Sequence, residues 1–139
     1  MKKKIVLIEG VYDTIDLFTR EIKKALEQMG CECLVLDAGH MEESLKEFAL
    51  FAMTPVFAAI TFNNLGYNLE LSEGKNIWEQ FEIPYVNILM DHPFHYTGPL
   101  AHMPKTAWVF CTDKNHVDFM HRFYPEIERV GFLPHAGVK

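Results

Sequence analysis

The residues best suited to chemistry in this chain follow an apolar run of strand length. Asp91 and His92 come directly after Tyr85–Met90, and His95 and Tyr96 lie a few positions further on. A carboxylate and an imidazole at a strand end can act as a positioned base or accept hydrogen bonds from sugar hydroxyl groups. The alternative is that Asp91 caps a turn and the aromatic rings pack. Local chemistry leaves these two interpretations about even.

Other polar residues follow the remaining apolar runs. The candidates for ligand contact are Glu9, Gly10 and Tyr12 after the first run, Asn63 after the third, Asp113 after the fifth and His135 after the sixth. Gly10 stands where dinucleotide-binding domains carry three spaced glycines, so close approach of a pyrophosphate is not expected. Turn chemistry is the alternative for Gly10 and for the amide-rich loop at Asn63. Since a Walker loop is also absent, we predict no cofactor.

The seven histidines raise the question of a metal site. Zinc takes three or four ligands that converge within bonding distance. His116 and His121 are spaced i, i+5 on an expected helix and do not share a face, and Pro93 argues against a helix that would join His92 to His95. We therefore predict no bound metal.

The composition is that of a single globular domain, residues 1–139. Hydrophobic residues make up 49% of the chain and charged residues 23%, which is far from the signature of disorder. A net charge of -6 would repel phosphate backbones, so no nucleic-acid partner is expected. The apolar run Ile5–Ile8 is too short for a signal peptide, no run approaches membrane-spanning length, and the three cysteines form no CxxC. These features predict a cytoplasmic protein.

Apolar runs of strand length alternate with segments of helical period. The expected strands are Ile5–Ile8, Cys33–Leu36, Val56–Phe62, Tyr85–Met90, Ala107–Cys111 and Ile127–Leu133. The expected helices are Thr14–Met29, a second with Met41, Leu45, Phe48 and Ala49 on one face, Asn76–Phe81 and Asn115–Phe123. Right-handed crossovers between such units predict an α/β domain, a doubly wound, Rossmann-like three-layer sandwich with a mostly parallel six-stranded sheet.

Parallel strands place every strand-to-helix loop at one edge of the sheet, where open α/β sheets bind ligands. In the usual doubly wound order the binding crevice opens between the first and fourth strands. We therefore expect the loop with Glu9, Gly10 and Tyr12 to face the segment with Asp91, His92, His95 and Tyr96.

The second half of the chain carries three motifs in a recognisable order. They are Ile83–Pro93 (IPYVNILMDHP), Trp108–Asp113 (WVFCTD) and Val130–Ala136 (VGFLPHA). Together they resemble the amino-terminal domain of GT-B glycosyltransferases, and most closely bacterial proteins of the spore-maturation glycosyltransferase type. In that group one strand ends in an acidic residue followed by a proline, a later strand in Thr-Asp or Ser-Asp, and a third in Leu-Pro.

The resemblance implies an acceptor-side domain that is inactive alone, with a carboxy-terminal domain outside this chain to hold the nucleotide-sugar. The implied partners are a carbohydrate or glycosylated acceptor and, through that second domain, the nucleotide-sugar. Asp91 and His92 would bind the acceptor or assist proton removal, Asp113 matches the strand-end acid, and His135 matches the exit toward the interdomain cleft. The histidine- and aromatic-rich stretch after Asp91 departs from the family pattern.

Two other classes stay open. A flavodoxin-like module would favour Ser and Thr after the first strand, where this chain has Gly10-Val11-Tyr12-Asp13, and a receiver domain would need an Asp where Asn63 and Asn64 follow the third strand. An interaction module is supported by the 13% aromatic content. Such a module should expose hydrophobic patches beside the carboxy terminus, through which the protein would form a homo-oligomer.

Overall fold

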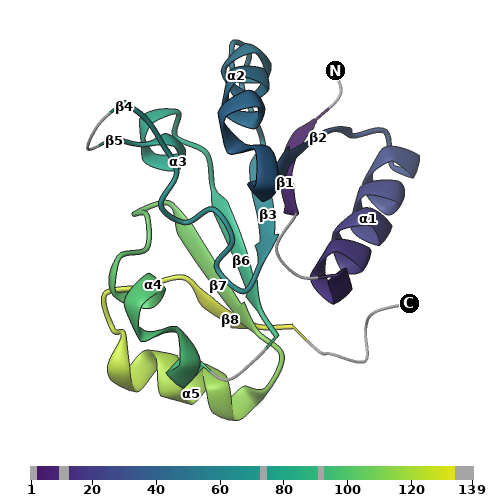
Figure 1. The fold of residues 1–139 in the computed structure, drawn as a ribbon. Coiled ribbons are helices and arrows are strands. Elements are labelled where there is room, and N and C mark those ends of the chain that lie inside the picture. The colour runs from purple at the N-terminus through teal and green to yellow at the C-terminus, as the bar shows by residue number, and fades with distance from the viewer. Residues whose placement is uncertain (1–2, 10–12, 73–74, 91–92, 134–139) are drawn as a thin grey trace.

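Strands and helices alternate along most of the chain (Figure 1). The structure, a computed structural model, describes residues 3–9, 13–72, 75–90 and 93–133. The main-sheet strands are β1 (Lys4–Glu9), β2 (Glu32–Asp37), β3 (Ala58–Phe62), β6 (Tyr85–Leu89), β7 (Ala107–Cys111) and β8 (Val130–Phe132). The helices are α1 (Asp13–Gln28), α2 (Met41–Phe51), α3 (Ile77–Gln80), α4 (Thr97–Ala101) and α5 (Lys114–Phe123). This architecture confirms the predicted α/β class with a doubly wound, six-stranded sheet.

Some short elements differ from the expected ones. A hairpin of β4 (Glu70–Ser72) and β5 (Lys75–Asn76) precedes α3, and α4 follows a 3₁₀ turn at Pro93–Tyr96. The hairpin, the 3₁₀ turn and α4 were not predicted, whereas α3 falls within the helix expected over Asn76–Phe81. Strand β8 is shorter than the expected run from Ile127 because the Ile127 N–H donates to the Tyr124 carbonyl, which keeps this segment off the β7 ladder.

The six strands of the main sheet are parallel and lie in the order β2-β1-β3-β6-β7-β8. Strand β3 pairs with β1 through Leu7 and Ile60 and with β6 through Phe62 and Ile88. The expected crevice between the first and fourth strands is therefore wrong, because β3 separates β1 from β6. The order is instead the flavodoxin-like one, which changes direction between β1 and β3.

The inner strands are buried on both faces, as a parallel sheet requires. Val6 and Ile8 on β1 pack with Phe48 of α2 and Trp78 of α3. The alternate residues of β1 face the other way, and Leu7 packs in a cluster with Ile22 and Leu26 of α1. The side-chain period of two in the strands thus sends successive residues to two separate cores.

The helices are distributed unequally over the two faces (Figure 1). Helices α2 and α3 share a core with Tyr85 of β6, while Leu100 of α4 and Met120 of α5 pack on Val109 and Cys111 of β7. All four therefore lie on one face of the sheet. Within the described ranges, α1 is the one helix on the opposite face, and its contacts reach β1, β2, β3 and β6.

The part of the sheet beyond α1 leaves aromatic side chains in solvent. Trp108 and Phe110 alternate with the buried Val109 and Cys111, so they point to the α1 side, and their rings are 6.5 Å apart. Trp108 is 41% exposed, and Leu133 beyond β8 is 42% exposed. These exposed apolar side chains lie on β7 and just after β8, next to the last described residues.

No helix in the described part of the chain combines the length and the apolar character needed to cross a membrane.

Candidate functional site

The strand order places the ligand edge of this sheet at the carboxyl ends of β1 and β3. In open α/β sheets the crevice forms where neighbouring crossovers leave in opposite directions. Here β1 leads through α1 to β2 on one side, and β3 leads through α3 to β6 on the other. The polar residues that follow β3, Asn63 and Asn64, therefore lie at the switch point itself.

Asn63 and Asn64 form an unusual turn directly after β3. Their backbone φ angles are 49° and 67°, in the left-handed region that non-glycine residues rarely adopt. Asparagine tolerates this region better than most residues, although each such residue still costs free energy. Two in succession persist only where surrounding contacts hold them, and residues of this kind cluster at functional sites.

A buried asparagine from the neighbouring strand holds this turn. Asn87 of β6 is fully buried, and its Oδ1 accepts from the Asn64 N–H at 2.9 Å. Its Nδ2 donates to the Asn64 Oδ1 at 2.6 Å. The pair behaves as a two-bond clamp between β6 and the turn. The Nδ2 atom of Asn64 is buried and has no hydrogen-bond partner among the described residues, which is costly in a core.

The rest of the loop is held through its carbonyl groups. Tyr85 Oη donates to the Leu65 carbonyl at 2.6 Å, Trp78 Nε1 to the Gly66 carbonyl at 2.7 Å and Asn76 Nδ2 to the Tyr67 carbonyl at 2.6 Å. Gly66 has φ 74°, and a Cβ there would collide with Cδ1 of Ile8 on β1. The loop is thus packed against the end of β1 in one conformation.

Asn63 also connects the turn to the segment that carries the strongest candidate residues. Its Oδ1 accepts from the Met90 N–H at 2.8 Å, and its own N–H donates to the Ile88 carbonyl at 2.9 Å. Met90 immediately precedes Asp91 and His92 in the sequence. Asn63 was predicted as a ligand contact, and its side-chain oxygen accepts a hydrogen bond that holds the chain at the end of β6.

The remaining predicted site residues divide into those whose side chains the structure describes and those whose side chains it does not describe. Glu9, at the end of β1, lies 3.6 Å from the Arg20 guanidinium of α1. Asp113 caps α5, because its Oδ1 accepts from the Asn115 N–H at 2.8 Å, and Tyr96 is half-buried against the α4 and α5 core. Outside the described residues lie Gly10, Tyr12, Asp91, His92 and His135, and the side chain of His95 is also not described.

A second carboxylate at this edge was not among the predicted contacts. Asp37 ends β2 directly opposite Glu9 in the ladder. Its Oδ1 accepts from the Gly39 N–H at 2.8 Å and its Oδ2 lies 3.1 Å from His40 Nδ1. These contacts, the Gly39 hydrogen bond first, lower the pKa of Asp37, so its carboxylate stays charged at neutral pH. The sequence signal was present, since Asp37 follows an apolar run as Glu9 does.

The chemistry available at this edge is that of hydrogen bonding and proton transfer. Carboxylates end β1 and β2, amides follow β3, and an acid and an imidazole follow Met90 in the sequence. Among the described residues there is no group of three His, Cys, Asp or Glu side chains that could hold a metal ion. Cys111 is fully buried, and its burial raises the pKa of its thiol to about 11, which does not suit a nucleophile.

Comparison of this chain with protein-family models, with curated proteins and with solved structures finds no match. The class that the structure itself defines is a doubly wound α/β domain with its polar loops at the β1 and β3 switch point.

Proposed function

We propose that this chain is the acceptor-side, amino-terminal domain of a two-domain glycosyltransferase of the GT-B type. In this proposal a second Rossmann-like domain holds the nucleotide-sugar, and the present domain binds a carbohydrate or glycosylated acceptor at its carboxyl edge. The observation that carries it is the Asn63–Asn64 turn at the switch point, which is hydrogen-bonded to Asn87 and to Met90, the residue before Asp91 in the sequence.

Two features support a polyhydroxylated ligand, and a third supports a partner domain. The edge combines carboxylate acceptors, Glu9 and Asp37, with an amide-rich turn, which is the mixture that pairs with sugar hydroxyl groups. The turn is held by Asn87 of β6, and the loop after it by Tyr85 and Trp78, so little ordering entropy would oppose binding. The exposed aromatic surface around Trp108 also supports a partner domain against this chain.

In the proposed reaction this domain supplies acceptor binding and a base. The carboxylate of Asp91 or the imidazole of His92 accepts the proton of an acceptor hydroxyl group as the hydroxyl oxygen bonds to the anomeric carbon of the donor sugar. The bond from that carbon to the nucleotide breaks, and the nucleotide leaves with the electron pair. Asn63 contributes by positioning, because its side chain fixes the backbone at Met90, one residue before this pair.

Saturation-transfer NMR on the purified chain tests the proposal. The probes are methyl glycosides of glucose, galactose, N-acetylglucosamine and rhamnose, with cyclohexanol as an apolar ring of similar size. We expect saturation transfer to at least one glycoside and none to cyclohexanol, and no turnover when a nucleotide-sugar is added to this chain alone. Absence of binding to every sugar, or equal binding of cyclohexanol, would count against an acceptor-side domain.

The strand order favours one other candidate, a flavodoxin-like binding module without catalysis. The order β2-β1-β3-β6-β7 is the one in which flavin binds beside β1 and β3. Titration with flavin mononucleotide, followed by quenching of flavin fluorescence, separates the candidates. The glycosyltransferase proposal expects no quenching, whereas saturable quenching that the glycosides do not relieve would favour the flavin module.

A further inference from the structure

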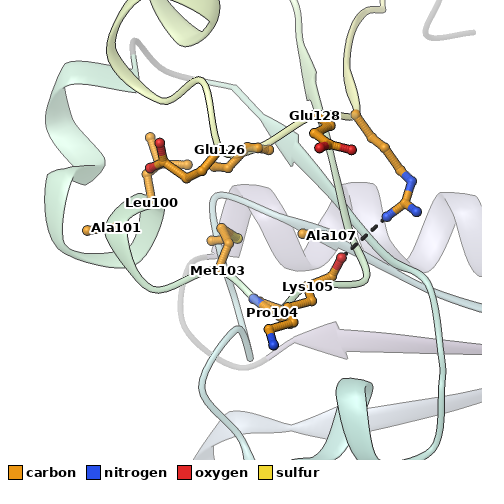
Figure 2. Close-up of a pocket in the computed structure, with 10 residues that line it drawn as sticks. Leu100, Ala101, Met103, Pro104, Lys105, Ala107, Glu126 and Glu128 are labelled. Atoms are coloured by element: carbon orange, nitrogen blue, oxygen red, sulfur yellow. Dashed lines mark hydrogen bonds between the residues drawn. The ribbon is translucent and has the colours of Figure 1, made fainter.

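A pocket lies at the edge of the sheet opposite the candidate site (Figure 2). It forms where the chain enters β7 and β8, so its walls come from the end of α4, the segment before β7 and the segment before β8. Its volume is about 360 Å³, within the range of sites that hold small ligands. Neither the predicted site residues nor the proposed acceptor site includes any part of it.

The floor of this pocket is apolar and well anchored. Leu100 and Ala107 are buried, Pro104 is buried beside them, and Met103 and Ile127 are half-buried. The Lys105 N–H donates to Glu79 Oε2 at 2.7 Å, and the Ala107 N–H donates to the Pro104 carbonyl at 3.0 Å. The floor therefore does not depend on a ligand for its shape.

The rim of the pocket carries four charges of both signs. Glu126 and Glu128 come from the segment before β8, Lys105 from the segment before β7, and Arg129 from the residue before β8. Arg129 donates to the Lys105 carbonyl at 3.3 Å, which ties the two segments together. In the part of the chain that the structure describes, none of these four side chains forms an ion pair.

The charges are separated across the floor. Figure 2 shows the Glu128 carboxylate and Lys105 on two sides of the floor with Ala107 between them, whereas the Glu126 carboxylate lies apart from that of Glu128, beside Leu100. A ligand that meets both sides needs a positive group and a negative group at opposite ends of an apolar body. The ammonium and carboxylate groups of a free amino acid are both attached to its α-carbon, whereas those of a peptide lie at its two ends.

We propose that this pocket binds a short apolar peptide with free termini. The peptide ammonium group meets Glu128, its carboxylate meets Lys105, and its apolar side chain lies on Leu100, Met103 and Ile127. Charge-assisted hydrogen bonds at both ends of the peptide give the site its selectivity. A ligand that lacks the ammonium or the carboxylate group leaves the charged side chains on one side of the pocket without a partner.

Chemical-shift titration of the ¹⁵N-labelled chain tests this assignment with the dipeptide alanyl-leucine as the probe. Shifts are expected at the amides of Met103, Lys105, Ile127 and Glu128. N-acetyl-alanyl-leucine lacks the ammonium group, alanyl-leucine amide lacks the carboxylate, and free leucine has both groups attached to its α-carbon. Each of these three should bind about 10-fold more weakly, or not at all.

Matched variants show whether the rim charges are responsible. Glu128→Gln and Lys105→Gln should each weaken alanyl-leucine binding about 10-fold. Glu47→Gln and Lys46→Gln make the same changes on the exposed face of α2 and should leave it unchanged. Thermal unfolding of all four variants verifies that they fold. The proposal is overturned if alanyl-leucine produces no shifts at the pocket, if its blocked forms bind equally well, or if the rim variants match their controls.

Discussion

Asn87 and Asn64 face each other inside the protein and exchange two hydrogen bonds, of 2.9 Å and 2.6 Å. One residue lies within a core strand and the other in a left-handed turn at the ligand edge. Asn87 is the single polar residue between Tyr85 and Leu89. Its presence in an otherwise apolar strand is explained by this contact, and the stability of the core is thereby coupled to the shape of the candidate site.

Replacing Asn87 with leucine should destabilise the protein strongly. Leucine has a similarly branched shape, although it is larger, and it can neither accept from the Asn64 N–H nor donate to the Asn64 side chain, so both groups would be buried without partners. Each such group costs about 1–3 kcal/mol, and we expect a loss of about 3 kcal/mol in the free energy of unfolding. Urea denaturation measures it.

The matched control is Asn68→Ala in the same loop, where the side chain is exposed. It should change the free energy of unfolding by less than about 0.5 kcal/mol. If Asn87→Leu were as mild as this control, the two hydrogen bonds would not be what holds the turn.

Three glycine substitutions should rank in a definite order. Gly66→Ala requires a left-handed alanine and a clash with Ile8, so it should cost about 3 kcal/mol or more. Gly30→Ala also has positive φ (91°) but meets open space, and should cost about 1 kcal/mol. Gly98→Ala lies in α4 with no neighbour within 4 Å and should be neutral or slightly stabilising. Thermal unfolding gives the ranking. Equal losses of stability for Gly66→Ala and Gly30→Ala would contradict the predicted clash with Ile8.

Cys111 should be the least reactive thiol of the folded protein. Burial, and to a lesser degree Asp113, raises the pKa of this thiol from 9.0 to about 11, so its thiolate fraction near neutral pH falls about 100-fold. Cys31 is half-buried and should be labelled first by a disulfide reagent, whereas Cys111 should need unfolding. A fall in the labelling of the folded protein on Cys111→Ala would contradict this.

The same raised pKa predicts a pH dependence of stability. The folded state holds the Cys111 proton more tightly than the unfolded state, so its contribution is constant below about pH 9 and is lost as the pH rises toward 11. The difference in free energy of unfolding between the wild type and Cys111→Ala should shrink over that window. A difference that stays level from pH 8 to pH 11 would contradict the assigned shift.

The fold class could be predicted because it follows from local pattern. The run that ends at Phe62 is apolar on both faces, as a central parallel strand must be, and Gly30 ends α1 where expected, with φ 91°. The strand order could not be predicted from local pattern. Right-handed crossovers require the strands to be parallel, but they do not determine which strand lies next to β1. Helix α4 was missed because Gly98 and Pro99, within its five residues, are typical of turns.

The candidate site was only partly predictable. Its position at a strand edge follows from topology, and Asn63 was identified by its place after β3. The clamp from Asn87 depends on two segments 23 residues apart, and no local pattern encodes such a pair. Asp113 was predicted as a ligand contact from its type and place, and the structure shows that its carboxylate also caps α5.

Mapping of sugar binding by amide chemical shifts tests the central claim, that the acceptor site lies at the carboxyl edge and is organised by the Asn63–Asn64 turn. Titration with the best-bound methyl glycoside should shift Glu9, Asn63, Asn64 and Met90. Asn63→Ala should weaken binding about 10-fold while the fold is retained, because the end of β6 is no longer held. Shifts confined to other surfaces, or unchanged affinity in Asn63→Ala, would contradict the account.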